Sequence, residues 1–271
     1  METAKIHLTG EKETLLATLY ARALECRSKG SILRDATAES VVRQIDYDFK
    51  KFKVRKRASA LVAIRAKRLD LWTAEFLADH PNSTVLHLGC GLDSRVLRVD
   101  PPATVRWFDL DHPEVIELRR RFYPERDGCR MIGSSVTDPG WLSEAPVGGP
   151  VMVVAEGLTM YLSAHDVRQL FERLTQRFSS GQLAFDACTP LGVRLTRRHP
   201  LIKATGASLD WGVDDPRELE GWIPRLKLVM ELPYTAAPEI AALPWVSSAV
   251  CRVLNHIPAL RSLGRLLRYQ F

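Results

Sequence analysis

Hydrophobic positions recur at helical spacing in three segments of the first 80 residues. Residues 11–29, 36–46 and about 58–78 each place large apolar side chains three or four positions apart, which is the period of an amphipathic helix. Asp35 can cap the second helix with its carboxylate. His80-Pro81 ends the third, because the residue before a proline avoids the α region. The pattern predicts three helices before the first strand, packed over a ligand site or forming part of a substrate lid.

Short apolar runs replace this spacing after residue 83. Runs at 85–88, 105–108 and 151–155 are typical of strands that are buried on both faces of a parallel sheet. Further strands are predicted at 130–133, 182–188, 208–212 and 226–232, the last as an antiparallel final strand, and helices at 113–123, 164–178 and 216–222. This alternation predicts an α/β fold. We expect a single domain over 1–271, with a helical part at 1–80, a core at 81–188 and a completing part and substrate cap at 189–271.

The stretch from Ser83 to Asp111 carries the first chemical signal. Gly89 and Gly91 follow the first strand at once, and glycines let the backbone turn tightly and approach a ligand. The second strand ends at Asp109 and Asp111, eighteen and twenty residues after Gly91. An acid at this distance, at the carboxyl end of a strand, can hydrogen-bond ribose hydroxyls. The stretch is therefore typical of a nucleoside-binding βαβ unit.

The residues after the second glycine distinguish between nucleoside cofactors. NAD-binding turns carry a third glycine and present a helix amino terminus to a pyrophosphate. This chain has Ser94 at the third glycine's place and a carboxylate, Asp93, where the pyrophosphate would lie. That charge disfavours NAD and favours a ligand with a cationic or zwitterionic end, such as S-adenosylmethionine.

Three motifs in order resemble the leucine carboxyl methyltransferase family: GCGLDSR at 89–95, FDLDHPEVIELRR at 108–120 and AEGLTMYL at 155–162. The sequence is similar in particular to its bacterial branch, which includes polyketide carboxyl O-methyltransferases of the tetracenomycin type. The likeness runs from about Leu15 to the carboxyl-terminal LLRYQF. It implies a Rossmann-like class I methyltransferase fold with a seven-stranded sheet, N-terminal helices and a helical lid or cap. It also implies S-adenosylmethionine as the cofactor, bound by the turn at Gly89 and Gly91 and by Asp111.

The resemblance implies roles for two further charged residues. Arg65, in the third predicted helix, matches the family arginine that binds the carboxylate of the cofactor's methionine part, and guanidinium and carboxylate pair in a two-bond fork. We expect this carboxylate to be the anionic partner that a buried arginine requires. Glu156 follows the 151–155 strand and would lie beside the sulfonium and the amino acid end. The structural alternatives are a surface arginine for Arg65 and a turn anchor for Glu156.

One loop departs from the family pattern. The family's adenine-contacting loop commonly reads Asp-Leu-x-Asp, but here Ser135 and Val136 hold the first two places and Asp138 the last. We expect the Ser135 hydroxyl to replace the carboxylate at some loss of affinity and the Val136 amide to contact the ring. Asp138 either touches the ligand or caps the turn that begins at Pro139.

Composition and charge restrict the remaining possibilities. The chain has 271 residues, 46% hydrophobic and 26% charged, with a net charge of +6. The five cysteines have no paired spacing, which predicts reduced thiols and neither a zinc site nor disulfides. No apolar run approaches the length of a membrane span, so we expect a cytoplasmic protein. The basic run KKFKVRKR at 50–57 has no nucleic-acid-binding motif around it, so we expect no nucleic-acid partner.

These features predict an S-adenosylmethionine-dependent O-methyltransferase that converts a carboxylate of a small-molecule or natural-product acid to a methyl ester. A carboxylate is ionised at neutral pH and needs no general base, which fits a sequence without a Ser-His-Asp set or a metal cluster. Tyr161 is the one side chain that we expect could face the substrate. The alternatives are a phenol or alcohol acceptor with a histidine base, a protein's carboxyl terminus, and a cofactor-binding protein without catalysis. The sequence leaves the acceptor and the oligomeric state open.

Overall fold

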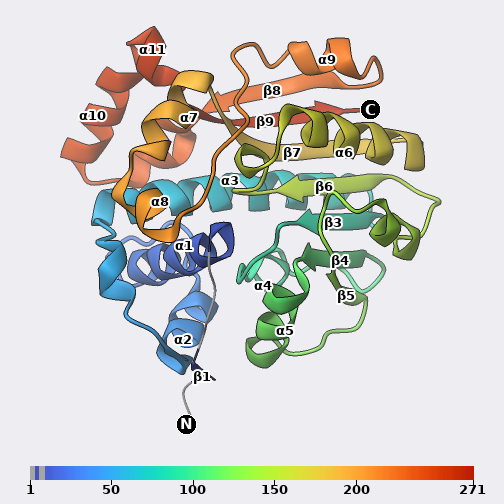
Figure 1. Cartoon of the computed structure of the whole chain (residues 1–271), viewed down its shortest axis with the longest axis horizontal. Helices are drawn as coiled ribbons and strands as arrows, with labels where there is room; N and C mark the ends of the chain where they lie inside the picture. Colours follow the sequence, from blue (N-terminus) through green and yellow to red (C-terminus); the bar gives the residue numbers. More distant parts are fainter. Residues whose placement is uncertain (1–3, 6–9) are drawn as a thin grey trace.

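A seven-stranded sheet lies at the centre of the computed structural model, which describes residues 4–5 and 10–271 (Figure 1). The strand order is β5-β4-β3-β6-β7-β9-β8. The strands are β3 (Thr84–Leu88), β4 (Arg106–Asp111), β5 (Cys129–Gly133), β6 (Val151–Ala155), β7 (Gly181–Cys188), β8 (Lys227–Pro233) and β9 (Gly264–Gln270). β5, β4, β3, β6 and β7 are parallel, and β9 is antiparallel to both β7 and β8. The predicted seven-stranded α/β sheet is confirmed.

Helices cover both faces of the sheet because successive side chains of each strand point to opposite faces. On one face, α3 (Lys56–Asp79) packs Trp72 into a cluster with Val85 of β3. On the other, α6 (Ala164–Arg177) packs Phe171 into a cluster with Leu86. All five residues of β3 and of β6 are buried, as expected for strands at the middle of a parallel sheet.

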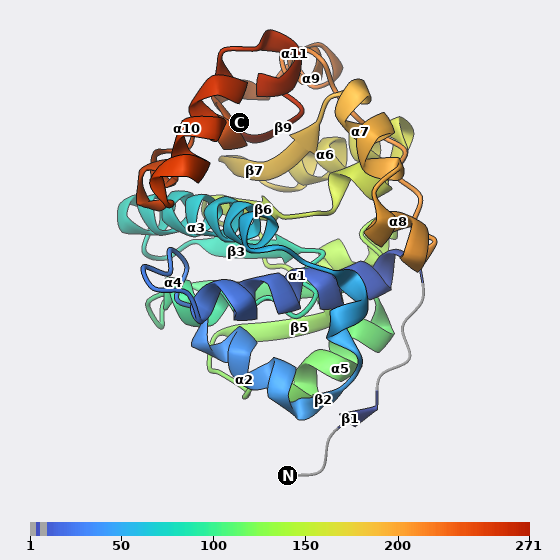
Figure 2. The same ribbon diagram turned by 90° about the vertical axis from the view of Figure 1, so that its left-hand side faces the viewer.

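The N-terminal helices lie across the carboxyl ends of the parallel strands. In Figure 2, which faces those ends, α1 (Glu11–Cys26) crosses the sheet, with α2 (Ala36–Gln44) below it and α8 (Pro200–Thr205) beside its start. Asp35 caps α2 by accepting a hydrogen bond from the Ala38 amide at 2.9 Å. Two short strands, β1 (Ala4–Lys5) and β2 (Ile45–Asp46), pair in parallel. The remaining helices are α4 (Arg95–Val99), α5 (Pro113–Phe122), α7 (Pro190–Arg197), α9 (Glu218–Trp222), α10 (Trp245–Asn255) and α11 (Pro258–Arg261).

Two predictions for the C-terminal part are wrong. The segment 226–232 does form a strand, β8, but β8 lies at the edge and runs parallel to β7, because the antiparallel strand β9 is inserted between them. The segment 208–212 is not a strand. It runs beside residue Met160, whose carbonyl accepts a hydrogen bond from the Asp210 amide at 2.8 Å. Its apolar residues are buried without strand pairing: Leu209 lies in a cluster with Met160, and Trp211 packs against Phe185 of β7.

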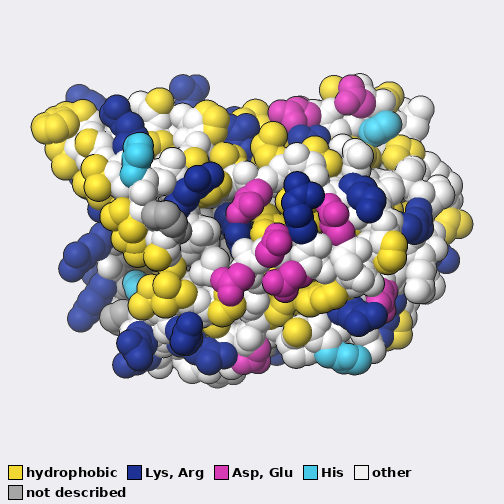
Figure 3. All heavy atoms as spheres, turned by 90° about the horizontal axis from the view of Figure 1, so that it is seen from above, with side chains coloured by type: hydrophobic (Ala, Val, Ile, Leu, Met, Phe, Trp, Pro, Cys, Tyr) yellow, Lys and Arg dark blue, Asp and Glu magenta, His cyan; other side chains and the backbone are white. Residues whose placement is uncertain are grey.

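The surface seen from above Figure 1 mixes charges of both signs (Figure 3). Basic side chains are interspersed with acidic ones there, and apolar side chains gather at the end where α10 and α11 lie. Trp245 and Val253 of α10 are 80% and 63% exposed. Within the described part of the chain, no helix is both long enough and apolar enough to cross a membrane.

Candidate functional site

A cavity of about 430 Å³ opens at the carboxyl ends of β3, β4 and β6, where open α/β sheets bind ligands. Eight residues for which the sequence predicts a binding or substrate-facing role line this one cavity, whereas Asp109 and Asp138 do not. The eight are Arg65, Gly89, Gly91, Asp111, Ser135, Val136, Glu156 and Tyr161. The structure therefore brings the predicted site together, and the individual roles stay predictions.

The glycine turn exposes bare backbone to the cavity. Gly89 and Gly91 have φ angles of 62° and 49°, in the left-handed region that L side chains rarely adopt. A Cβ on Gly89 would lie 3.1 Å from the Leu158 side chain, so a larger residue would crowd the opposite wall. The Gly91 amide donates to Asp111 Oδ2 at 2.7 Å. The turn and the acid at the end of β4 are thus held together.

Asp111 is fixed by backbone donors and still faces the cavity. Its Oδ1 accepts a second hydrogen bond, from the His112 amide at 2.7 Å. Burial raises the pKa of Asp111, and the two amides partly offset this shift. A carboxylate oxygen can accept more than one hydrogen bond, so both oxygens of Asp111 have capacity left for ribose hydroxyls.

Asp109, the other acid of β4, has a structural position. It is 2% exposed. Its carboxylate accepts hydrogen bonds from Arg119 at 2.6 and 3.1 Å and from the Trp107 indole at 2.9 Å. His87 Nδ1 lies 2.9 Å from the same carboxylate. Burial would raise the pKa of Asp109, but Arg119 and the hydrogen bonds outweigh it and lower the pKa to about 2. Of the two acids, only Asp111 lines the cavity.

Arg65 already has two anionic partners in the protein, so it does not depend on the cofactor for its anion, contrary to the expectation from the sequence, and its contact with the cofactor's carboxylate stays a prediction. Its Nε donates to Glu156 Oε1 at 2.9 Å, and its Nη1 donates to Asp186 Oδ2 at 2.9 Å. The side chain is only 14% exposed, so it is not a surface arginine. Among residues 4–5 and 10–271, its Nη2 donates no hydrogen bond to another residue, and it lies next to Gly157, where an added Cβ would be 3.6 Å away. This third donor remains for a ligand carboxylate.

Glu156 is the meeting point of a buried network of ion pairs. It accepts hydrogen bonds from Arg65 and from Arg95 of α4. Arg95 also pairs with Asp93 at 3.1 Å and Asp70 at 3.2 Å. Burial would raise the pKa of Glu156, but Arg65 and Arg95 outweigh it and lower the pKa. Glu156 is therefore ionised at neutral pH, and its two oxygens are paired with two arginines at the floor of the cavity.

The loop after β5 contributes two of its three predicted residues. Ser135 and Val136 line the cavity, and the Ser135 hydroxyl lies 2.8 Å from the Thr137 hydroxyl. Asp138 does not line it. Its carboxylate accepts from the Gly140 amide at 2.8 Å and caps the 3₁₀ turn at Pro139–Glu144. Of its two predicted roles, Asp138 has the structural one.

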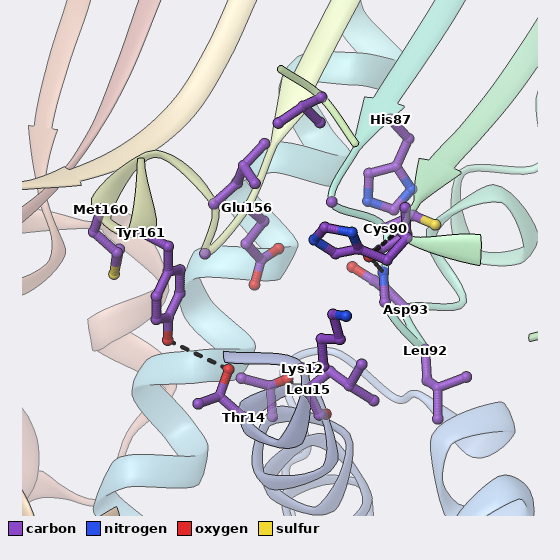
Figure 4. Close-up of a pocket in the computed structure, with 18 of the residues that line it drawn as sticks. Lys12, Thr14, Leu15, His87, Cys90, Leu92, Asp93, Glu156, Met160 and Tyr161 are labelled. Carbon is purple, nitrogen blue, oxygen red and sulfur yellow. Dashed lines mark hydrogen bonds between the residues drawn. The ribbon is translucent and has the colours of Figure 1, made fainter. Parts of the chain in front are cut away.

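The sequence missed most of the contribution of α1 to the cavity. Figure 4 shows Lys12, Thr14 and Leu15 of α1 on the opposite side of the cavity from Glu156, with Thr14 joined to Tyr161 by a hydrogen bond. The remaining lining residues are Thr18, Arg22, His87, Cys90, Leu92, Asp93, His112, Gly157, Leu158, Met160, Leu162 and Ser208. Of these, Asp93 was singled out from the sequence as the carboxylate that disfavours NAD. The positions near the glycine turn could have been found from their motif. The positions on α1 carry no such signal.

The cavity fits S-adenosylmethionine by the chemistry of its walls. The cofactor is cationic at its sulfonium and ammonium groups and anionic at its carboxylate. The cavity offers the ionised Glu156 and Asp93 for the first and the free edge of Arg65 for the second. The open glycine backbone and Asp111 supply the close approach and the acceptors that a ribose needs.

Comparisons with known proteins identify the family. A model of the leucine carboxyl methyltransferase family matches residues 15–127. The tetracenomycin polyketide synthesis O-methyltransferase TcmP of Streptomyces glaucescens is 47% identical over 266 residues, which cover 98% of each chain. The S-adenosyl-L-methionine-dependent methyltransferase dpfgK of Gibberella zeae is 37% identical over 248 residues, 84% of this chain and 83% of that one.

Solved structures share the fold. A duf574 family protein from Streptomyces avermitilis superimposes with a TM-score of 0.58 over 93% of this chain and 96% of that one. The two sequences are 12% identical, so this likeness concerns the fold alone.

Proposed function

Because this chain belongs to the leucine carboxyl methyltransferase family and is a class I methyltransferase that uses S-adenosylmethionine, we propose that it esterifies a carboxylate of a small polyketide-type acid. The near full-length similarity to a polyketide O-methyltransferase supports the substrate class. The observation that carries the choice of a carboxylate is the position of Tyr161, which lines the cavity (Figure 4) and can donate a hydrogen bond from its hydroxyl to an anion. Burial raises the pKa of this phenol, so at neutral pH it is protonated and suited to donate a hydrogen bond, not to remove a proton.

The side chains of this chain would bind and align the reactants. S-adenosylmethionine, when bound, supplies an electrophilic methyl group: a carboxylate oxygen forms a bond to the methyl carbon while the carbon–sulfur bond breaks and its electron pair stays on sulfur. Asp111 would accept hydrogen bonds from the ribose, Arg65 Nη2 would donate to the methionine carboxylate, and Glu156 would stabilise the positive end. No proton moves, so the protein's task is alignment and exclusion of water.

A hydroxyl acceptor is the second candidate, and the position of His112 favours it. His112 lines the cavity directly after Asp111, where an imidazole could accept the proton that a phenol must lose. The two candidates differ in the product: a carboxylate gives an ester, whereas a phenol gives an ether.

The test uses S-adenosylmethionine with a labelled methyl group and three acids: benzoate, 2-naphthoate and anthraquinone-2-carboxylate. Phenol, 2-naphthol and 2-hydroxyanthraquinone are the matched hydroxyl compounds. We expect label in the product of at least one acid and its release as methanol in mild base, because esters hydrolyse there and aryl ethers do not. Label that appears only with the hydroxyl compounds and resists base would overturn the carboxylate assignment in favour of a phenol acceptor.

A further inference from the structure

The predicted cofactor contacts occupy only part of the cavity and leave one end of it unassigned. Ser135, Val136 and Asp111 follow β5 and β4, and Gly89 and Glu156 follow β3 and β6. In the strand order β5-β4-β3-β6-β7, these residues run along the sheet from one side to its middle and trace a path from adenine to the methionine part. The cavity continues beyond Glu156, on the side toward β7.

That remaining end is formed by the segment after β6 and by α1. Tyr161, at the end of the 3₁₀ turn Thr159–Tyr161, lines it together with Met160 and Thr14. In Figure 4, Tyr161, Met160 and Thr14 lie on one side of Glu156, and His87, Cys90 and Asp93 lie on the other. The cavity therefore has room for a methyl acceptor between the 3₁₀ turn and the start of α1.

We propose that the hydroxyl groups of Tyr161 and Thr14, the hydroxyl pair, bind the carboxylate of the methyl acceptor and orient it for attack. The proposal rests on the proposed function. Tyr161 Oη donates to Thr14 Oγ1 at 3.3 Å, although the two residues are 147 positions apart in the sequence. A hydroxyl has one proton to donate and can rotate, so an acid that binds here would take the Tyr161 proton from Thr14 Oγ1, and both hydroxyls would then turn toward the same carboxylate.

Neutral donors suit a carboxylate nucleophile better than a cation does. A guanidinium would bind both carboxylate oxygens in a fork, and it would draw negative charge away from the attacking atom. The cations of the cavity wall have protein carboxylates as partners: Arg65 pairs with Glu156 and Asp186, Arg22 with Asp35, and Lys12 with Glu114. The remaining donor of Arg65 is assigned to the cofactor's carboxylate. The hydroxyl pair can bind one oxygen of the acceptor and leave the other oxygen free to attack.

Burial keeps the hydroxyl pair in its donor form. Thr14 is 9% exposed, and burial raises the pKa of Tyr161, so the phenol retains its proton throughout the neutral range. A hydrogen bond to a charged group inside a protein is worth more than one between neutral groups. Each hydroxyl should therefore contribute measurably to the binding of an acid, and little to the binding of its neutral methyl ester.

The test compares Tyr161→Phe and Thr14→Val with the wild type, using whichever of the three acids the wild type esterifies fastest. We expect each substitution to raise the KM for the acid about tenfold to a hundredfold. The dissociation constant of S-adenosylhomocysteine should stay within about twofold of the wild-type value. Calorimetric titration of the acid into protein saturated with S-adenosylhomocysteine should show the same loss without turnover, and Thr14→Ser should restore binding because it restores the hydroxyl.

A matched control is Tyr269→Phe. Tyr269 is a fully buried tyrosine of β9 whose hydroxyl donates to the Pro216 carbonyl at 2.7 Å, outside the cavity. This substitution removes the same group and should leave the KM for the acid unchanged. If it raised the KM as much as Tyr161→Phe does, the effect would be one of stability and the proposal would be wrong.

The outcomes separate this proposal from the proposed function. If the wild type esterifies an acid and both Tyr161→Phe and Thr14→Val keep its KM within about twofold, the hydroxyl pair is refuted and the carboxyl methyltransferase stands. The same holds if the two variants lose affinity for the acid and for S-adenosylhomocysteine equally. If the wild type esterifies no acid, the proposed function fails, and the hydroxyl pair fails with it.

Discussion

Replacing Arg65 with Ala should destabilise the fold and weaken the binding of S-adenosylhomocysteine at the same time. The substitution removes one hydrogen bond to Glu156 and one to Asp186, whose side chains are 5% and 0% exposed. Breaking a buried ion pair from one side typically costs about 3–5 kcal/mol. We expect a value near the lower end of that range, because Glu156 keeps Arg95 and Asp186 keeps the Tyr234 hydroxyl at 2.9 Å.

Urea unfolding of Arg65→Ala, Arg65→Lys and the wild type measures this loss. Arg65→Lys should lose less than Arg65→Ala, because it keeps the charge and loses the fork. The loss in Arg65→Ala should also depend on pH. In the wild type the pKa of Glu156 is lowered, so Glu156 contributes stability above its unfolded pKa of about 4.3, and this contribution is lost as pH falls through the folded pKa. Without Arg65 that contribution shrinks, so the difference from wild type should be larger at pH 7 than at pH 4.

The ligand arm of the experiment separates binding from folding. Arg65→Ala should weaken S-adenosylhomocysteine about tenfold or more, since a hydrogen bond to a charged group is worth about 1.5–3 kcal/mol. Methylthioadenosine, which lacks the amino acid end, should bind almost as before. Arg68→Ala is the control: Arg68 is in the same helix, is 15% exposed and pairs with Glu239 at 2.6 Å outside the cavity. Equal loss of both ligands in Arg65→Ala would refute the assigned contact.

Three further outcomes are expected. Asp111→Ala should raise the dissociation constant of S-adenosylhomocysteine about tenfold to a hundredfold by removing the ribose acceptors, and an unchanged constant in calorimetry would exclude the ribose role. Asp109→Asn should lower the free energy of unfolding by about 3–5 kcal/mol, because it leaves Arg119 buried without its anion. Because the pKa of Asp109 is lowered to about 2, its contribution to wild-type stability should be present above pH ~4 and disappear as pH falls toward 2. A flat urea-unfolding profile between pH 5 and 2.5 would contradict this. Ser135→Asp should tighten the binding of S-adenosylhomocysteine several-fold if a carboxylate there accepts a hydrogen bond from the adenine amino group, because a charged acceptor binds more strongly than a neutral one. A weaker or equal affinity in the same titration would remove Ser135 from the adenine site.

The elements with strong local signals were predicted almost to the residue. The apolar run at 151–155 is β6, and Ser163 caps α6 by accepting from the Asp166 amide at 3.1 Å. These signals are local because a buried strand needs apolar side chains on both faces and a helix start needs an acceptor for its free amides. The parallel arrangement then brings the ends of the strands to one edge, so the predicted residues that follow the strands gathered in one cavity.

β9 was not among the predicted strands, and its place between β7 and β8 could not be predicted, because it depends on partners and not on composition. β8 contains Val229 and Met230, which are apolar and yet 45% and 42% exposed. β9 carries Arg265 and Arg268 and lies inside the sheet. Arg265 is buried because its guanidinium donates to the carbonyls of residues 213 and 214 and pairs with Glu231 at 2.6 Å. Hydropathy therefore favours β8 as the interior strand, and long-range hydrogen bonds reverse that order.

The two halves of the cavity differ in how far a sequence can specify them. The half at Gly89 and Asp111 comes from one continuous βαβ unit, where a strand, a turn and the next strand fix the positions of the side chains within about twenty residues. The half at Thr14 exists only because α1 packs against α3 and because Arg22 donates to the Leu92 carbonyl at 2.9 Å, seventy positions away. A substitution on the cavity face of α1 can thus change the acceptor end without altering the glycine turn or the acid of β4. This independence gives a physical reason why one cofactor-binding unit can serve methyltransferases with different acceptors.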